Sequence, residues 1–111
     1  MNYGRTDIVV CDSNQDLGER AARAVAEYLR ARLAGKDALR MVFAAGESQS
    51  TFCRALAQQP DIDWQRITCF NMDDFWDPRL SKRFTCGYQT EQELLSTRAV
   101  RRLSPGRLRR P

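Results

Sequence analysis

The sequence predicts a layered α/β domain with a mainly parallel sheet flanked by helices. Three observations lead to this prediction: apolar runs suited to buried strands at 7–12, 38–46 and 66–72, helical patterns after the first two runs, and short polar connections. Strands that alternate with helices are typical of parallel strands joined by right-handed crossovers. At 111 residues the chain is long enough for one such domain.

The first strand and helix are read from residues 7–35. The run "DIVVCD", 7–12, is short, apolar and β-branched, as in buried strands. Ser13 is then suited to cap a helix, with Asp16 in its first turn. From 17 to 33 the charged side chains share one side and the apolar ones the other, which predicts an amphipathic helix that ends at Gly35.

The second and third strands are predicted at 38–46 and 66–72. Residues 47–59 read as a helix that follows the second strand with almost no loop, and Pro60 with the acidic "DID" forms the connection to the third strand. The resulting arrangement is Rossmann-like. Ligands bind such sheets beyond the carboxyl ends of the strands, so residues 45–48 and 71–74 are expected to face one crevice.

After Trp76 the pattern weakens. A polar loop precedes "TEQELLS", where Thr90 is suited to cap a helix with Glu93 at its third position. We therefore divide the chain into an α/β domain, 1–96, and an arginine-rich tail, 97–111, that is expected to be disordered or loosely attached.

Charge and hydropathy exclude several classes of protein. No apolar stretch has the length of a membrane span, and the N-terminus lacks the features of a signal peptide, which predicts a cytoplasmic location. Six arginines and no acids follow Thr97. Removing these six from the 18 basic residues leaves 12 against all 14 acids in 1–96, a net charge of about −2. The body of the protein therefore does not have the charge of a nucleic-acid-binding domain.

The four cysteines do not form a metal-binding pattern. They are widely spaced, and the chain has no histidine to complete a common zinc site, so no metal is expected. Three of them lie in or beside apolar segments, where a free thiol packs as a small hydrophobe; catalysis or redox sensing is the alternative.

The turn "AAGESQS" has two interpretations. Gly46 permits close approach to the backbone, Ser48 offers a hydroxyl and the next helix presents free N–H groups, as in an anion cradle. The alternative is a common strand-to-helix turn with a serine cap. Glu47 counts against an anion site, because a carboxylate repels a phosphate.

The stretch "FNMDDF", 70–75, is the second candidate. Asp73 and Asp74 follow the third strand, so one of them is placed to act as a general base, or both cap a turn or helix. Trp64, Phe75 and Trp76 are expected in the core rather than on a ligand.

Taken together, "AGESQ", 45–49, and "FNMDDF", 70–75, resemble the glucosamine-6-phosphate deaminase (isomerase) family over about residues 6–95. The related 6-phosphogluconolactonases have a different acidic motif and fit less well. The resemblance implies an aldose-ketose isomerisation of an amino-sugar phosphate with loss of ammonia and no redox cofactor. It also implies that Asp73 is the general base and that Gly46, Ser48 and Asp74 lie against the substrate.

The chain departs from that family in ways that affect the expected activity. Members are more than twice as long, and their second half supplies a histidine and phosphate-binding basic residues. We therefore expect an incomplete version of the sugar-phosphate isomerase fold, weakly active or inactive unless another polypeptide completes the site. The alternative is a non-catalytic module that binds a sugar phosphate or, through its tail, polyanions. An open sheet edge and uncovered apolar faces predict a homo-oligomer.

Overall fold

A computed structural model describes residues 1–44, 46–74, 77, 79, 81 and 86–95. The predicted tail, 97–111, and the aromatic residues Phe75 and Trp76 lie outside the described residues. No helix in the described part of the chain is both long and apolar enough to span a membrane.

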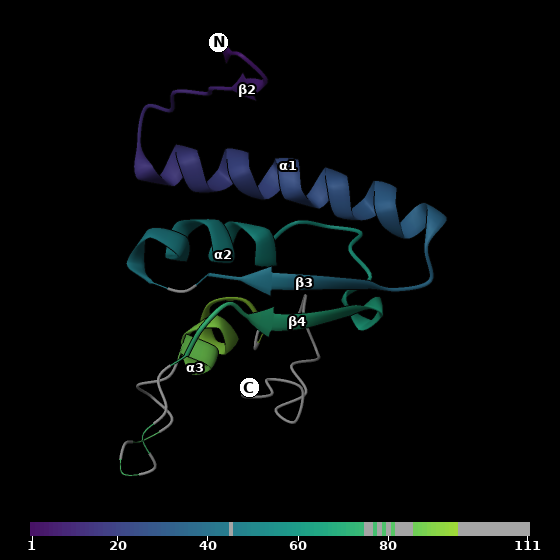
Figure 1. Cartoon of the computed structure of the whole chain (residues 1–111), viewed down its shortest axis with the longest axis vertical. Helices are drawn as coiled ribbons and strands as arrows, with labels where there is room; N and C mark the ends of the chain where they lie inside the picture. The colour runs from purple at the N-terminus through teal and green to yellow at the C-terminus, as the bar shows by residue number, and fades with distance from the viewer. Residues whose placement is uncertain (45, 75–76, 78, 80, 82–85, 96–111) are drawn as a thin grey trace.

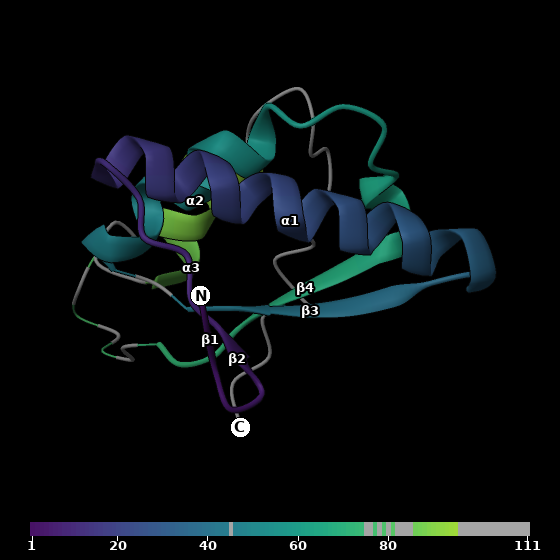
Figure 2. The ribbon, with the colours of Figure 1, turned by 90° about the horizontal axis from the view of Figure 1, so that it is seen from above.

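A parallel ladder forms the centre of the fold. Strands β3 (Leu39–Phe43) and β4 (Ile67–Asn71) pair in parallel, with Leu39 opposite Ile67 and Phe43 opposite Asn71. Helices α1 (Asn14–Gly35) and α2 (Ser50–Ala57) lie together on one side of this pair (Figures 1 and 2). The predicted layered α/β architecture is confirmed, and the parallel direction follows from the crossover that contains α2.

The core lies between the helices and the covered face of the sheet. Its side chains come from α1, β3, α2, β4 and the segment 86–95, and the buried residues are Ala22, Ala26, Leu29, Leu33, Phe43, Cys53, Leu56, Ala57, Trp64, Ile67, Cys69 and Leu94. Trp64 belongs to a 3-10 turn, η2 (Trp64–Arg66), and is buried as predicted. The guanidinium of Arg66, in the same turn, donates to the carbonyls of Leu33 and Asp37 at 2.8 and 2.9 Å and to that of Lys36, which satisfies free groups at the end of α1.

The predicted strand over 7–12 is wrong. A small hairpin forms instead, in which β1 (Asn2–Tyr3) pairs antiparallel with β2 (Thr6–Asp7) across a turn where Gly4 has φ +62°. Figure 1 shows this hairpin on the far side of α1 from β3. Val9 and Val10, beyond the hairpin, are 61% and 80% exposed. Thr6 and Asp7 pair with Tyr3 and Asn2 rather than with β3 or β4. The apolar side chains of Val9 and Val10 therefore stay exposed.

The other predicted elements are confirmed with shifted ends. The helix over 47–59 is a 3-10 turn, η1 (Glu47–Gln49), followed by α2. The helix expected to begin at Thr90 begins earlier: α3 (Cys86–Thr90) continues into a π-helical turn, η4 (Glu91–Leu95). Thr90 is therefore inside the helix, and its hydroxyl donates to the carbonyl of Cys86 at 3.1 Å rather than capping an N-terminus.

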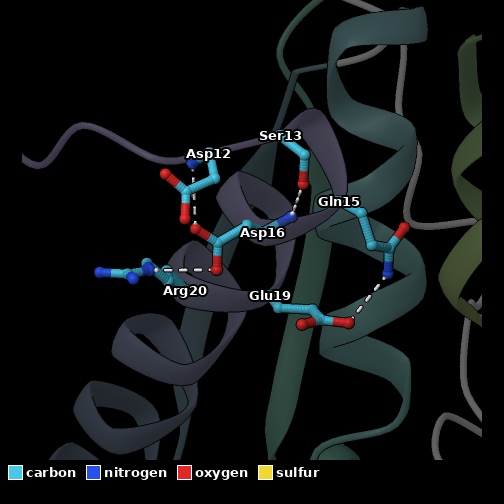
Figure 3. Close-up of polar contacts among 6 residues, drawn as sticks. All are labelled: Asp12, Ser13, Gln15, Asp16, Glu19 and Arg20. Carbon is cyan, nitrogen blue, oxygen red and sulfur yellow. Dashed lines mark hydrogen bonds and ion pairs between the residues drawn. The ribbon is translucent and has the colours of Figure 1, made fainter.

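The start of α1 agrees with the prediction in detail (Figure 3). Ser13 Oγ accepts from the Asp16 N–H at 3.0 Å, as an N-cap residue does. The Asp16 carboxylate accepts from Arg20 Nε at 3.1 Å and from the Asp12 N–H at 3.3 Å. The hydrogen bond from Arg20, followed by that from Asp12, lowers the pKa of Asp16.

Replacing Asp16 by Asn is expected to destabilise the protein at neutral pH and to matter less in acid. Because the pKa of Asp16 is lowered by folding, its stabilising effect is present above the ordinary carboxyl pKa and is lost as the pH falls through the lowered value. Urea midpoints of the two proteins, measured from neutral to strongly acidic pH, check this.

Glu19→Gln is the matched control, since Glu19 accepts from the neutral Gln15 side chain at 3.0 Å. It should leave the acid dependence unchanged. A wild-type to Asp16→Asn difference that stays constant down to strongly acidic pH would contradict the ion-pair explanation.

Helices α1 and α2 approach closely because α1 presents small residues to α2. Ala22 and Ala26 are fully buried, and Gly18, one turn earlier, lies against Thr51 of α2. A Cβ at position 18 would lie 2.6 Å from the Thr51 carbonyl carbon. The separation of the two helices therefore depends on a glycine at this position.

Gly18→Ala is expected to lower the free energy of unfolding by about 1–3 kcal/mol, as in other overpacked cores. The matched control is Gly35→Ala, where no atom lies within 4 Å of the added Cβ; it should be neutral or stabilising by about 0.4–1 kcal/mol. Urea unfolding of the three proteins measures both changes. Equal stability of the two variants would rule out the close contact.

Candidate functional site

The parallel register places the two predicted motifs at one edge of the sheet. Phe43 and Asn71 are partners at the carboxyl ends of β3 and β4, and the Met72 N–H donates to the Phe43 carbonyl at 2.8 Å, which extends the ladder by one residue. Gly46 and Ser48 follow β3, and Asp73 and Asp74 follow β4. The common edge expected from the sequence is therefore confirmed.

The turn after β3 depends on Gly46. This residue has φ +124° and ψ 166°, a backbone conformation that L side chains rarely adopt, and its carbonyl accepts from the Gln49 N–H at 3.0 Å. No atom lies within 4 Å of a Cβ built on Gly46, so the backbone is open to approach from that side. Ser48 and Glu47 are exposed in η1. The turn offers a hydroxyl and accessible backbone, with a carboxylate beside them.

The two acids after β4 have different surroundings. Both are exposed, but the Asp74 carboxylate accepts from the Cys86 N–H at 2.7 Å and so caps the start of α3. This contact satisfies the capping alternative for Asp74. Asp73 is the other exposed carboxylate at this strand end.

The charges of both acids affect the pKa of the Cys86 thiol. Its thiol is half-buried, and burial, then the nearby carboxylates of Asp74 and Asp73, raise its pKa. Burial raises the pKa of Cys69 to about 12, and burial together with Glu93 raises that of Cys53 to about 11. The prediction that the buried thiols pack as small hydrophobes is confirmed for Cys53 and Cys69.

Asp74→Asn and Asp73→Asn are each expected to speed the alkylation of Cys86 severalfold at fixed mildly alkaline pH. Removing a negative charge lowers the thiol pKa, and one pKa unit changes the thiolate fraction by about tenfold. The asparagine at 74 keeps an acceptor for the Cys86 N–H. Mass spectrometry of iodoacetamide-treated protein distinguishes Cys86 from Cys11.

Asp37→Asn, at the opposite end of β3, is the control with the same change of charge and should leave the rate at Cys86 unchanged. An unchanged rate in both Asp73→Asn and Asp74→Asn would show that neither carboxylate lies close to the thiol in solution.

Polar side chains of β4 and α2 form hydrogen bonds with the segment 86–95. Asn71 Nδ2 donates to Thr90 Oγ1 at 2.9 Å, and Ser50 Oγ donates to the Glu93 carboxylate at 2.6 Å. Sequence reasoning missed these contacts, since it assigned Thr90 and Glu93 to a local cap. No signal in the sequence pairs residues so far apart. Within the described ranges, no three histidine, cysteine, aspartate or glutamate side chains gather as metal ligands.

Several solved structures with this arrangement are 6-phosphogluconolactonases. The model superposes on a 6-phosphogluconolactonase from Shewanella baltica OS155 with a TM-score of 0.71 and 19% identity, over 80% of this chain and 37% of that one. A putative 6-phosphogluconolactonase from Neisseria gonorrhoeae FA 1090 matches with a TM-score of 0.68 and 26% identity, over 80% and 38% of the two chains. This chain has part of the 6-phosphogluconolactonase fold.

A third solved structure has the same fold. The 6-phosphogluconolactonase TM1154 from Thermotoga maritima gives a TM-score of 0.65 and 25% identity, over 87% of this chain and 41% of that one. The chain thus spans less than half the length of the solved proteins that it matches. No family model and no curated protein matches the sequence.

The comparisons confirm, at the level of the fold, the predicted relation to the glucosamine-6-phosphate deaminases. The 6-phosphogluconolactonases share their fold with the deaminases to which the motifs were compared, although the acidic motif "FNMDDF" fits the lactonases less well. The expected incomplete version of a sugar-phosphate enzyme fold agrees with the partial coverage of the matched structures.

Proposed function

We propose that this chain binds a phosphorylated sugar between the turn 46–48 and the acids 73–74, and that the site is of the amino-sugar-phosphate isomerase and deaminase type. The observation that carries the proposal is the placement of both motifs at one sheet edge in a fold used by sugar-phosphate enzymes. Fold alone does not define a function. The choice of an amino sugar rests on the motif "FNMDDF".

Asp73 is the base in this proposal. Its carboxylate removes the proton from C2 of the open-chain sugar and returns it to C1, while the C1 oxygen gains a proton and the amine loses one through solvent. This converts the 2-amino aldose into a 1-hydroxy-2-imine; addition of water to the imine then releases ammonia and leaves the ketose. A carboxylate suits this step because one group both accepts and returns the proton. Its exposed position after β4 leaves room for a substrate to approach.

The turn after β3 holds the phosphate in this proposal. The Gly46 backbone is open to approach, and the Ser48 hydroxyl is exposed beside it. Glu47 is exposed in the same 3-10 turn and points to weak binding by this turn alone, because its charge repels an anion. We infer that the described residues bind a sugar phosphate weakly and turn it over slowly without further polypeptide.

The second candidate is a site for 6-phosphogluconate or its lactone, which the names of the matched proteins favour. Lactone hydrolysis requires addition of water to a carbonyl rather than transfer of a proton between two carbons. The two candidates therefore differ in the ligand that stabilises the protein and in whether a C–H proton exchanges with solvent.

A ligand titration with a proton-exchange assay tests the proposal. Glucosamine 6-phosphate is expected to raise the Tm more than 6-phosphogluconate or inorganic phosphate does, because it is the ligand for which the proposed site is selective. A ligand at a hundredfold excess over its Kd adds about 2.7 kcal/mol to stability. In D2O the protein is expected to catalyse deuterium incorporation at C2, measured by NMR. Asp73→Asn should abolish the incorporation while weakening binding only modestly.

Asp37→Asn, with the same charge change at the other end of β3, should behave as the wild type. Preferential stabilisation by 6-phosphogluconate would favour the second candidate. No response to any of the three ligands would contradict a sugar-phosphate site in this chain.

A further inference from the structure

Residues 86–95 contact both turns of the candidate site. The Cys86 N–H donates to the Asp74 carboxylate at 2.7 Å, Thr90 Oγ1 accepts from Asn71 Nδ2 at 2.9 Å, and the Glu93 carboxylate accepts from Ser50 Oγ at 2.6 Å. Asn71 and Asp74 border the strand end after β4, whereas Ser50 directly follows the turn 46–49. The segment thus joins two turns that come from different strands.

The contact with Asn71 has a fixed direction. The Thr90 hydroxyl has one proton, which it donates to the Cys86 carbonyl at 3.1 Å, so Oγ1 is left to accept from the Asn71 amide. This orients the carboxamide: Nδ2 faces Thr90, and Oδ1 is buried with no partner among the described residues. Thr90 is itself only 3% exposed. The end of β4 is therefore held by a directional, partly buried contact.

The contact with Ser50 is short and charge-assisted. A hydroxyl that donates to a partly buried carboxylate forms a stronger bond than one between neutral groups. Gln89 Nε2 lies 3.5 Å from the same Glu93 oxygen. Leu94, the next residue, is fully buried against the core. Packing of Leu94 in the core therefore fixes the position of the segment that includes Glu93.

The spacing along the segment explains how one helix serves both turns. Thr90 is the last residue of α3, and Glu93 lies three residues later, in the π-helical turn. The π-helical turn that begins at Glu91 widens the helix between them; such turns are frequent at functional sites. The π-helical turn contacts α2 and α3 contacts β4, and Figure 2 shows α3 at the end of the sheet where β3 and β4 finish.

We propose that Thr90 and Glu93 are positioning residues for the sugar-phosphate site: Thr90 holds the strand end that carries Asp73, and Glu93 holds the turn that carries Gly46 and Ser48. This proposal rests on the proposed function for its biological meaning. The distance between the phosphate-binding turn and the base is then set by residues 86–95, which touch neither the phosphate nor the reacting carbons.

Local amide hydrogen exchange tests the positioning without any ligand. In Thr90→Val the Met72 amide, which donates to Phe43, is expected to exchange at least tenfold faster than in the wild type, with the Gln49 amide unchanged. In Glu93→Leu the Gln49 amide, which donates to Gly46, is expected to respond and that of Met72 is not. Thr90→Ser and Glu93→Gln keep the hydroxyl and an acceptor, so they should restore most of the protection.

Glu91→Gln removes a charge from the same π-helical turn and serves as the control; it should change neither amide. A uniform increase over all amides of β4 in either variant would mean that the contacts only stabilise the fold, and unchanged exchange at both reporters would overturn the proposal. If Thr90→Val or Glu93→Leu does not fold, Asn71→Ala and Ser50→Ala, which remove the partners of the same two hydrogen bonds, are measured at the same reporters and judged by the same outcomes.

Ligand affinity provides the second readout. With glucosamine 6-phosphate as the probe, Thr90→Val and Glu93→Leu are each expected to raise the Kd about tenfold, with rescue by the conservative variants. If the wild type binds none of the sugar phosphates, the proposed function fails while the exchange data still decide whether the two residues position the turns. Full affinity in variants whose reporter amides exchange faster would show that the spacing of the turns does not govern binding.

Discussion

The parallel pairing of β3 with β4 is the interaction on which the rest of the structure depends. Parallel strands end at the same edge of a sheet, so the register that sets Phe43 beside Asn71 also brings the two following turns to one place. A shift of one residue would turn the apolar side chains of β4 away from the helices. The chemistry proposed at residues 46–48 and 73–74 therefore follows from hydrogen bonds within the sheet.

The helices fix this ladder in position from one side. α1 packs closely on α2 at Gly18 and Thr51, which holds the crossover helix against the sheet. Arg66, just before β4, donates a hydrogen bond to the Leu33 carbonyl near the end of α1. At the other end of the sheet, residues 86–95 connect the two turns through Thr90 and Glu93. Packing thus fixes the direction of the strands, and directional polar contacts fix their ends.

Sequence patterns predicted the elements with a clear periodic or apolar signal and missed the hairpin and the side-chain contacts, whose partners composition does not define. The amphipathic helix with its Ser13 cap and the two apolar strands have clear periodic signals, and their parallel order followed from the alternation. The run 7–12 has the composition of a strand, but strand formation requires a partner, and the adjacent hairpin provided one only for Thr6 and Asp7.

The candidate site was predictable in part for the same reason. Gly46 and Asp73 could be placed because they follow recognisable strands. The roles of Thr90 and Glu93 could not be predicted, since the sequence "TEQE" is equally suited to a local cap and only the folded chain brings Asn71 and Ser50 to them. The cap of α3 likewise comes from Asp74, twelve residues earlier.

The parallel ladder also determines the order in which the molecule is assembled. The N-terminal hairpin and α1 consist of contacts between residues close in the chain, which form early and at little cost in loop entropy. The ladder must wait until residues 44–66, which contain α2, have folded back across it. The two turns meet only at that point, so the region assigned to binding is completed late in folding, after the local helices have formed.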